Sequence, residues 1–153
     1  NTDAHIYGVD LETGYVFDEH WRIDAGLNYV EGRQANGGYL YRMAPFNGRA
    51  QLTFEHSGFM GSVEGVGYAA QNKVATYNNE EATKGYAVMN LRANYEAFDG
   101  FLIGAGVENL LDSVNENHLG GYSRPMSMDS SVAQGGRIPM PGRNYYATMT
   151  YQW

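Results

Sequence analysis

The chain has 153 residues, no cysteine and a formal net charge of −7. Its length suits one ordinary domain, and the lack of cysteine excludes disulfides and thiolate metal sites. The acidic balance, without any basic cluster, argues against a nucleic-acid partner. Aromatic residues make up 14% of the sequence although its mean hydropathy is negative, and this combination favours half-buried strands over a helical core.

No apolar run in the sequence is long enough for a membrane helix. The start at Asn1 shows no basic and then apolar leader, so we expect a mature form or a fragment.

Seven segments alternate apolar and polar residues, and we predict each to be a strand because successive side chains of a strand point to opposite faces. In chain order they cover residues 7–17, 21–29, 49–55, 59–69, 87–96, 101–108 and 143–153. The fourth has the weakest pattern, since glycines interrupt its apolar face. Most of the seven reach the length of about 9–11 residues with which a tilted strand crosses a bilayer.

Short and long connections alternate strictly between these segments. Tight turns are expected at 18–20, 56–58 and 99–100, and long loops at 32–48, 72–85 and 114–142. All four prolines fall in the long loops, as a sheet requires. Outer-membrane barrels have this pattern, with short periplasmic turns and long external loops, so the last strand is expected to run towards the periplasm.

The competing fold is a soluble β-sandwich, whose strands also alternate. Aromatic residues at the ends of the apolar face favour the barrel, because they match interfacial girdles. These residues are Tyr7, Phe17, Trp21, Tyr29, Tyr95, Phe101, Tyr145 and Trp153. The fold class predicted is therefore all-β, with about seven antiparallel transmembrane strands in an up-and-down meander that forms part of a larger barrel.

Two C-terminal motifs resemble those of a known family. The stretch 106–113, GVENLLDS, resembles the G-x-x-N-L-(F/L)-D signature in the penultimate strand of TonB-dependent outer-membrane receptors. The stretch 141–153, PGRNYYATMTYQW, resembles the C-terminal box of that family, and segments 14–32 and 85–112 are similar to its late barrel strands. The chain departs from the family pattern in ending on Trp153 instead of Phe, and in carrying Ala44-Pro45-Phe46 where a Pro-Pro pair is usual.

The resemblance implies a fold and a function. Transporter barrels have about 22 strands around a plugged lumen, so we expect residues 1–153 to be the C-terminal segment of such a barrel, without its plug domain or energy-coupling TonB box. The implied function is TonB-driven uptake of a scarce ligand, such as an iron-siderophore or a metal chelate, across the outer membrane of a Gram-negative bacterium. No cofactor and no catalytic residue are expected. The implied partners are the outer-membrane lipid, the rest of the barrel with its plug, and the TonB complex.

Charged residues on the polar side of the predicted strands are expected to line the barrel lumen, pairing with one another or contacting plug and water. They are Arg22, Asp24, Arg49, Glu55, Glu64, Arg92, Glu96 and Glu108.

The last long loop is a candidate metal site. It holds His118, Met126 and Met128, and imidazole and thioether groups suit Cu(I) or another soft metal. Within the family, the segment 115–125, NENHLGGYSRP, resembles the copper-receptor branch most. The alternative is that Met fills gaps in a loop as an adaptable side chain.

The strand 143–153 has a second expected role. With Tyr145, Tyr151 and Trp153 on its apolar side, it resembles the C-terminal signal that the barrel-assembly machinery binds.

Two other functions stay open. A small self-contained pore or adhesin of about eight strands would need a further strand at 39–43, and a barrel lipid hydrolase would need a serine to pair with His118 as base.

Overall fold

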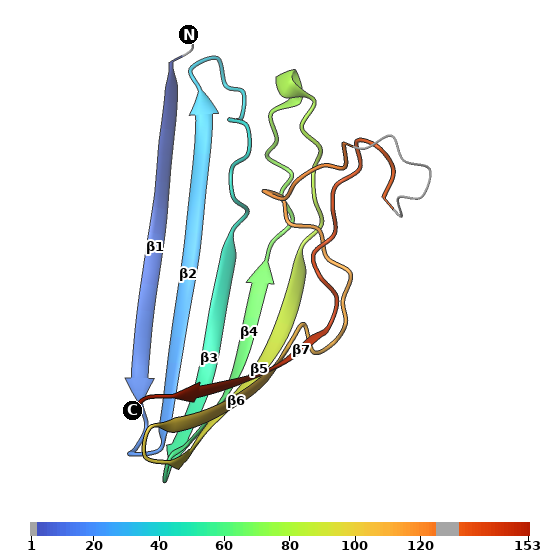
Figure 1. The fold of residues 1–153 in the computed structure, drawn as a ribbon. Coiled ribbons are helices and arrows are strands. Elements are labelled where there is room, and N and C mark those ends of the chain that lie inside the picture. Colours follow the sequence, from blue (N-terminus) through green and yellow to red (C-terminus); the bar gives the residue numbers. More distant parts are fainter. Residues whose placement is uncertain (1–2, 125–131) are drawn as a thin grey trace.

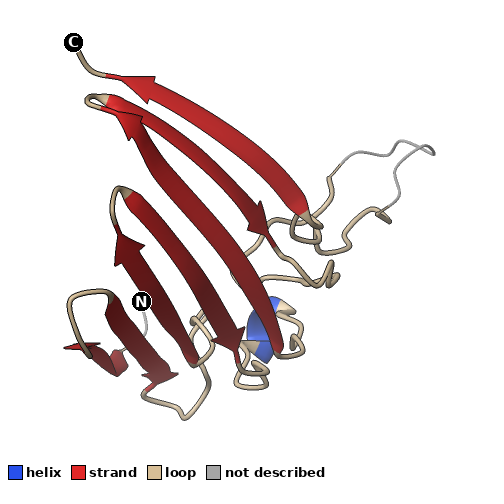
Figure 2. Ribbon diagram, turned by 90° about the horizontal axis from the view of Figure 1, so that it is seen from below, coloured by secondary structure: helices blue, strands red, loops and turns tan. Residues whose placement is uncertain are grey.

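The structure is a computed structural model that describes residues 3–124 and 132–153. Seven antiparallel strands form one curved sheet in chain order (Figures 1 and 2). They are β1 (Ala4–Val16), β2 (Trp21–Gln34), β3 (Asn47–His56), β4 (Phe59–Tyr68), β5 (Tyr86–Phe98), β6 (Phe101–Glu108) and β7 (Asn144–Tyr151). The predicted all-β meander of seven strands is confirmed. Within the described ranges, no helix combines the length and the apolarity needed to span a membrane.

The strand ends differ from the prediction at the loop side of β1 and β2. The alternation of apolar residues stops at Tyr29, yet pairing continues from Tyr7↔Glu31 to Ala4↔Gln34. Three of these four pairs contain Glu31, Arg33 or Gln34, and a pattern of apolar residues cannot reveal a strand that continues after the apolar face ends. The long loop expected to start at residue 32 therefore starts at residue 35.

The register separates the side chains into an apolar and a polar face. One row of paired residues crosses all seven strands on the apolar face, and an adjacent row crosses on the polar face. The first row consists of Tyr15, Ile23, Leu52, Val63, Leu91, Val107 and Tyr145, and the second of Val16, Arg22, Thr53, Ser62, Arg92, Gly106 and Tyr146.

The apolar face has no protein layer against it. Leu27 is 47% exposed and Met149 74% exposed, and among the described residues Ala75 is the one buried hydrophobic residue. A sandwich would bury this face against a second sheet, whereas a membrane barrel presents it to lipid. The soluble sandwich is therefore excluded by the packing of the described residues.

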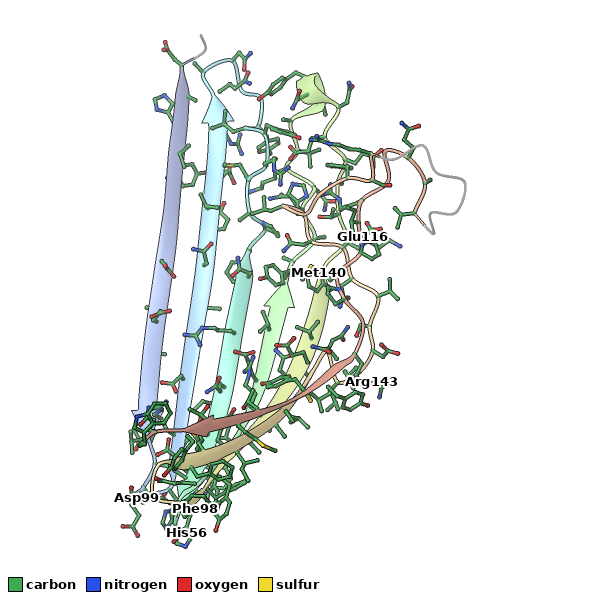
Figure 3. The ribbon with its side chains drawn as sticks, in the orientation of Figure 1. His56, Phe98, Asp99, Glu116, Met140 and Arg143 are labelled. Carbon is green, nitrogen blue, oxygen red and sulfur yellow. The ribbon has the colours of Figure 1, made fainter. Side chains whose placement is uncertain are left out.

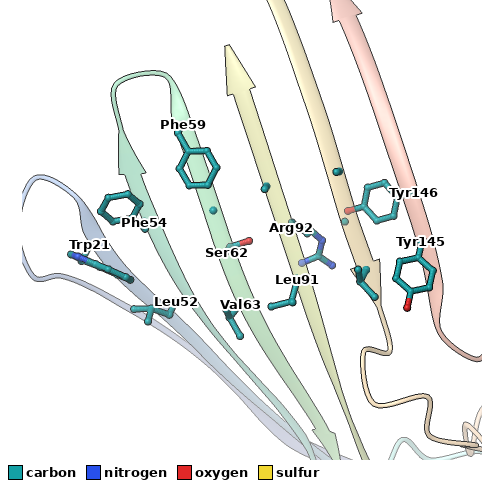
Figure 4. A pocket seen from close by; sticks show the side chains of 15 residues that line it. Trp21, Leu52, Phe54, Phe59, Ser62, Val63, Leu91, Arg92, Tyr145 and Tyr146 are labelled. Atoms are coloured by element: carbon teal, nitrogen blue, oxygen red, sulfur yellow. The ribbon is translucent and has the colours of Figure 1, made fainter. Parts of the chain in front are cut away.

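Aromatic side chains gather at the hairpin end of the apolar face. Trp21 contacts Phe54 with ring centroids 4.9 Å apart, and Phe59 follows at 6.4 Å from Phe54 (Figure 4). At the loop end of the same face, the rings of Tyr7 and Tyr29 lie 6.4 Å apart. Two aromatic belts at opposite ends of an apolar band match the two interfaces of a membrane.

The tight turns and the long loops lie at opposite ends of the sheet (Figure 1). Ser57 and Gly58, which join β3 to β4, both have positive φ, of 47° and 78°. A two-residue hairpin with positive φ at both positions matches the right-handed twist of its strands. At the other end, the loop between β4 and β5 contains the 3₁₀ turn η1 (Thr76–Asn78).

Candidate functional site

The polar face carries the predicted wall charges. The register places all of them on this face, across β2, β3, β4, β5 and β6. Arg92 lies 3.1 Å from Glu64 on the neighbouring strand, and Asn90 donates to the same carboxylate at 2.7 Å. Polar side chains of neighbouring strands are therefore connected on this face by ion pairs and hydrogen bonds.

Two further arginines of the polar face also form ion pairs. Arg22 pairs with Asp24 two residues along β2, at 2.8 Å. Arg49 pairs with Glu12 of β1 at 3.5 Å, a partner that sequence reasoning missed. Among the described residues, neither Glu96 nor Glu108 has an ion pair. Glu108 stands at the loop end of the polar face and Glu96 at the hairpin end.

The GVENLLDS motif closes the base of the third long loop. Asn109 directly follows β6 and has a φ of 50°. Its side-chain amide donates to the carbonyl of Ser113 at 2.8 Å and to that of Pro141 at 3.3 Å. Its side-chain oxygen accepts from the backbone N–H of Ser113. Asp112 accepts from the backbone N–H of Arg143, the residue before β7 (Figure 3). The motif thus holds together the two ends of the loop that connects the last two strands.

Glu80 joins all three long loops in one buried cluster. Its carboxylate accepts from the backbone N–H of Arg42 in the first loop at 2.8 Å and from that of Ala75 in its own loop at 2.7 Å. It also lies 3.1 Å from Nε2 of His118 in the third loop, and Thr83 lies 3.0 Å from Nδ1 of the same ring.

Arg137 strengthens this cluster from the returning half of the third loop. It is 8% exposed, and it donates to the backbone carbonyl of His118 and to the hydroxyl of Tyr122, the latter at 2.7 Å. It also donates to the carbonyl of Glu81 at 3.4 Å. Sequence reasoning identified neither Glu80 nor Arg137, because both lie in polar loop segments without a motif.

The chemistry of His118 follows from these contacts. Burial lowers the pKa of the imidazole, and Arg137 and Arg42 lower it further against the opposing effect of Glu80. A neutral ring that donates from Nε2 to Glu80 accepts at Nδ1 from the Thr83 hydroxyl, so both ring nitrogens are satisfied.

The described residues do not test whether the predicted metal ligands come together. His118 uses both nitrogens within the cluster, and Met126 and Met128 lie outside the described residues. Residues 3–124 and 132–153 contain no group of three His, Cys, Asp or Glu side chains with metal-binding geometry. Copper binding at this loop stays a prediction.

A cavity of about 250 Å³ lies on the polar face under the third loop. The rings of Tyr68 and Tyr86 stack in its wall, 4.8 Å apart at 22°. Glu108, Asn90 and Met140 also line it. Stacked rings, a carboxylate, a carboxamide and a thioether together offer both apolar and hydrogen-bonding contacts at the mouth of the wall.

The further strand at 39–43 that a small self-contained barrel would need is not formed. Residues 39–43 contribute one isolated bridge, between Tyr39 and Arg33. The ring of His118 contacts Thr83 and Glu80, so among the described residues it has no serine partner of the kind that a lipid hydrolase was expected to need. A curved meander with one apolar and one polar face, hairpins at one end and long loops at the other is the wall of an outer-membrane barrel.

Known proteins agree with this class. A family model described as "TonB dependent receptor-like, beta-barrel" matches residues 1–110. The chain belongs to this family of TonB-dependent receptors. Its members are transport receptors of the Gram-negative outer membrane, and the chain is assigned to that membrane.

Solved structures share the fold over almost the whole chain. The structure of "Copper transporter OprC" matches with a TM-score of 0.89 and 24% identity, over 99% of this chain and 24% of that one. The ferric yersiniabactin uptake receptor FyuA from Yersinia pestis matches with a TM-score of 0.73 and 16% identity, over 97% and 23%. The ferripyoverdine receptor of Pseudomonas aeruginosa matches with a TM-score of 0.68 and 13% identity, over 97% and 19%. No curated protein matches the sequence. The chain spans about a quarter of the length of the first two of these receptors.

Proposed function

We propose that the chain is the C-terminal wall of a TonB-coupled receptor that imports a scarce metal chelate or metal ion. The observation that supports this most is the cavity under the third loop, with Glu108 and the stacked pair Tyr68 and Tyr86 on the polar face. In the proposed receptor this face lines the lumen, and a plug domain outside the chain contacts its charged residues and connects to TonB.

Copper is the first ligand to test, and a ferric siderophore the second. Two features support copper: the resemblance of residues 115–125 to the copper-receptor branch, and the close match in fold to a solved copper transporter. Solved siderophore receptors match the same strands with lower TM-scores, which keeps the siderophore as the second candidate.

Uptake by the intact receptor tests this proposal. The receptor is expressed in a strain without its other metal receptors, with and without TonB, and cell-associated copper and iron are measured by mass spectrometry in limiting medium with copper salt or a ferric siderophore. TonB-dependent accumulation of one metal is the expected result. Accumulation that is equal without TonB would show a passive pore.

The cavity can be tested in the same assay. Glu108→Gln removes a carboxylate at the mouth of the wall, and Glu96→Gln removes one at the hairpin end of the same face. We expect Glu108→Gln to reduce uptake several-fold at low ligand concentration and Glu96→Gln to leave it unchanged. Equal uptake by both variants would remove the cavity from the ligand path.

The candidate metal ligands need a separate measurement. Met126→Leu with Met128→Leu keeps side-chain size and removes the thioethers, and binding of Cu(I) by the intact receptor is followed by competition with a chromophoric chelator. Unchanged affinity excludes the two methionines. A metal would take one ring nitrogen of His118, so the histidine can join such a site only if its bond to Glu80 or its bond to Thr83 breaks.

We also propose that β7 is bound by the barrel-assembly machinery during insertion. Its apolar side carries Tyr145 and Tyr151, which are 67% and 55% exposed, and Trp153 follows the strand. Trp153→Ser is expected to lower the amount of receptor in the outer membrane and to leave the stability of the receptor that does insert unchanged.

A further inference from the structure

The lipid-facing side of β2 changes from apolar to charged at one position. From Trp21 to Tyr29 every second residue is apolar, and the next residues on the same face are Glu31 and Arg33. The stretch between Trp21 and Tyr29 measures about 27 Å at roughly 3.4 Å per residue. Tilted, such a stretch covers most of an apolar band about 25 Å tall. Glu31 and Arg33 therefore lie at the level of the outer-leaflet headgroups, on the side that faces lipid.

Glu31 organises a cluster at this level. Its side chain is 4% exposed, and it accepts from the hydroxyl of Tyr29 at 2.7 Å and from Nε of Arg33 at 2.6 Å. It also pairs with Nζ of Lys73, which comes from the loop between β4 and β5. A carboxylate with three donors holds its two cations in fixed positions.

Aromatic rings support both cations. The guanidinium of Arg33 lies 4.9 Å from the ring centre of Tyr39, and the ammonium of Lys73 lies 5.7 Å from that of Tyr29. Both distances are in the range of cation–π attraction. The side chains of Arg33 and Lys73 remain 47% and 46% exposed, so the cationic ends are oriented but still accessible.

The cluster has donors left for an anion. Glu31 accepts a hydrogen bond from Nε of Arg33, and no described residue accepts one from the terminal Nη groups of that guanidinium. Two cations against one carboxylate leave a charge of +1, in a chain whose net charge is −7. A guanidinium with free donors beside an ammonium matches the geometry of a phosphate group.

We propose that Arg33 and Lys73 bind a phosphate of a glycolipid headgroup in the outer leaflet of the outer membrane. The position selects the lipid as the source of the phosphate, because the cluster lies on the lipid-facing side and directly above the apolar band, away from the polar face. Hydrogen bonding to Glu31 also raises the pKa of Lys73, whose ammonium is charged at neutral pH even at its ordinary pKa. This site is independent of the transported ligand.

The test uses the intact receptor that contains this chain, purified in detergent and freed of bound lipid. Binding is measured by native mass spectrometry with three probes: bisphosphorylated lipid A, lipid A without its phosphates, and inorganic phosphate. The variant is Arg33→Gln with Lys73→Gln. The matched control is Lys84→Gln with Arg124→Gln, which removes the same charge from other external-loop positions. The single variant Lys73→Gln changes a loop residue only and serves if the double variant does not fold.

We expect the double variant to bind bisphosphorylated lipid A roughly tenfold more weakly or worse, since each basic group near a charged lipid surface contributes about 1 kcal/mol. Lys73→Gln alone is expected to weaken binding of bisphosphorylated lipid A about three- to fivefold, and the control variant less than twofold. Lipid A without phosphates should bind equally to all of these proteins. Equal lipid A binding by variant, control and unmodified receptor would overturn the site. Cluster-dependent binding of inorganic phosphate without binding of lipid A would overturn the lipid as its ligand.

Discussion

The imidazole of His118 and the carboxylate of Glu80 lie 3.1 Å apart, with side chains that are only 1% and 2% exposed. They come from two different loops, and Glu80 also accepts a hydrogen bond from the backbone N–H of Arg42 in the first long loop. The three external loops are therefore one connected structure and not three independent segments.

Glu80→Ala is expected to release this connection. The change leaves the N–H groups of Arg42 and Ala75 and one nitrogen of His118 without their acceptor, and each buried unsatisfied group costs about 1–3 kcal/mol. Hydrogen exchange at the Arg42 and Ala75 amides should accelerate by at least tenfold. Glu81→Ala is the matched control, because the neighbouring carboxylate is exposed. Similar exchange in the two variants would contradict the role of Glu80.

Acidification is expected to open the same loops. Burial holds the pKa of His118 below its ordinary value of about 6.5. The loop-closed state thus binds fewer protons than the open state, so the contribution of His118 to closure is complete above about pH 6.5 and is lost as the pH falls below it. Exchange of the Ala75 amide, corrected for its intrinsic rate, should increase below pH 6.5. In His118→Gln this pH dependence should disappear, and its persistence would assign it to another group.

Asn109→Ala is expected to free the base of the third loop. The change removes three side-chain bonds to Ser113 and Pro141 and places Ala at a φ of 50°. We expect a loss of about 2–4 kcal/mol in the unfolding free energy, from unsatisfied groups and backbone strain. Unfolding by guanidinium in detergent measures it. Asn144→Ala, at an exposed position on β7, should cost less than about 0.5 kcal/mol.

Gly106→Ala tests how tightly the polar face packs. A Cβ at Gly106 would lie 2.4 Å from the ring of Tyr146, whereas a Cβ at Gly65 would meet nothing within 4 Å. Gly106→Ala should therefore cost about 1–3 kcal/mol, and Gly65→Ala should be neutral or slightly stabilising. The same unfolding measurement compares the two. If Tyr146→Ala restores the stability of Gly106→Ala, the clash is the cause.

Opposite faces of β3 should respond differently to a charge. Leu52 lies on the apolar face and Gln51 on the polar face. Leu52→Arg is expected to destabilise the inserted receptor by up to about 2–4 kcal/mol, because the charge enters the hydrocarbon layer. Gln51→Arg should cost less than about 1 kcal/mol. Refolding into lipid vesicles, followed by gel mobility without heating, gives both values. Equal effects would contradict the assignment of the faces.

Sequence patterns predicted the strands well, because each strand has one side in lipid and one in a polar environment. Tyr15, Ile23 and Leu52 were therefore visible as part of an alternation. The ends of β1 and β2 were missed because Glu31 to Gln34 extend above the apolar band, where no hydrophobic constraint produces a period of two.

The loops could not be predicted in this way. Asn109 was recognisable from its motif, although its function in closing a loop became clear only from its bonds. Glu80 and Arg137 had no signal at all. Their partners are mostly backbone atoms, in their own loop or in another loop, and such contacts do not constrain which residue types occur at the partner positions.

The hairpin of Ser57 and Gly58 also bears on how such a protein evolves. A two-residue turn with left-handed geometry at both positions accepts few other residues and no insertion without shifting the register of β3 against β4. The external loops have no such restriction on their length. New ligand specificities are therefore expected to arise by lengthening and recombining the outer segments, while the inner rim of the barrel keeps its length from one descendant to the next.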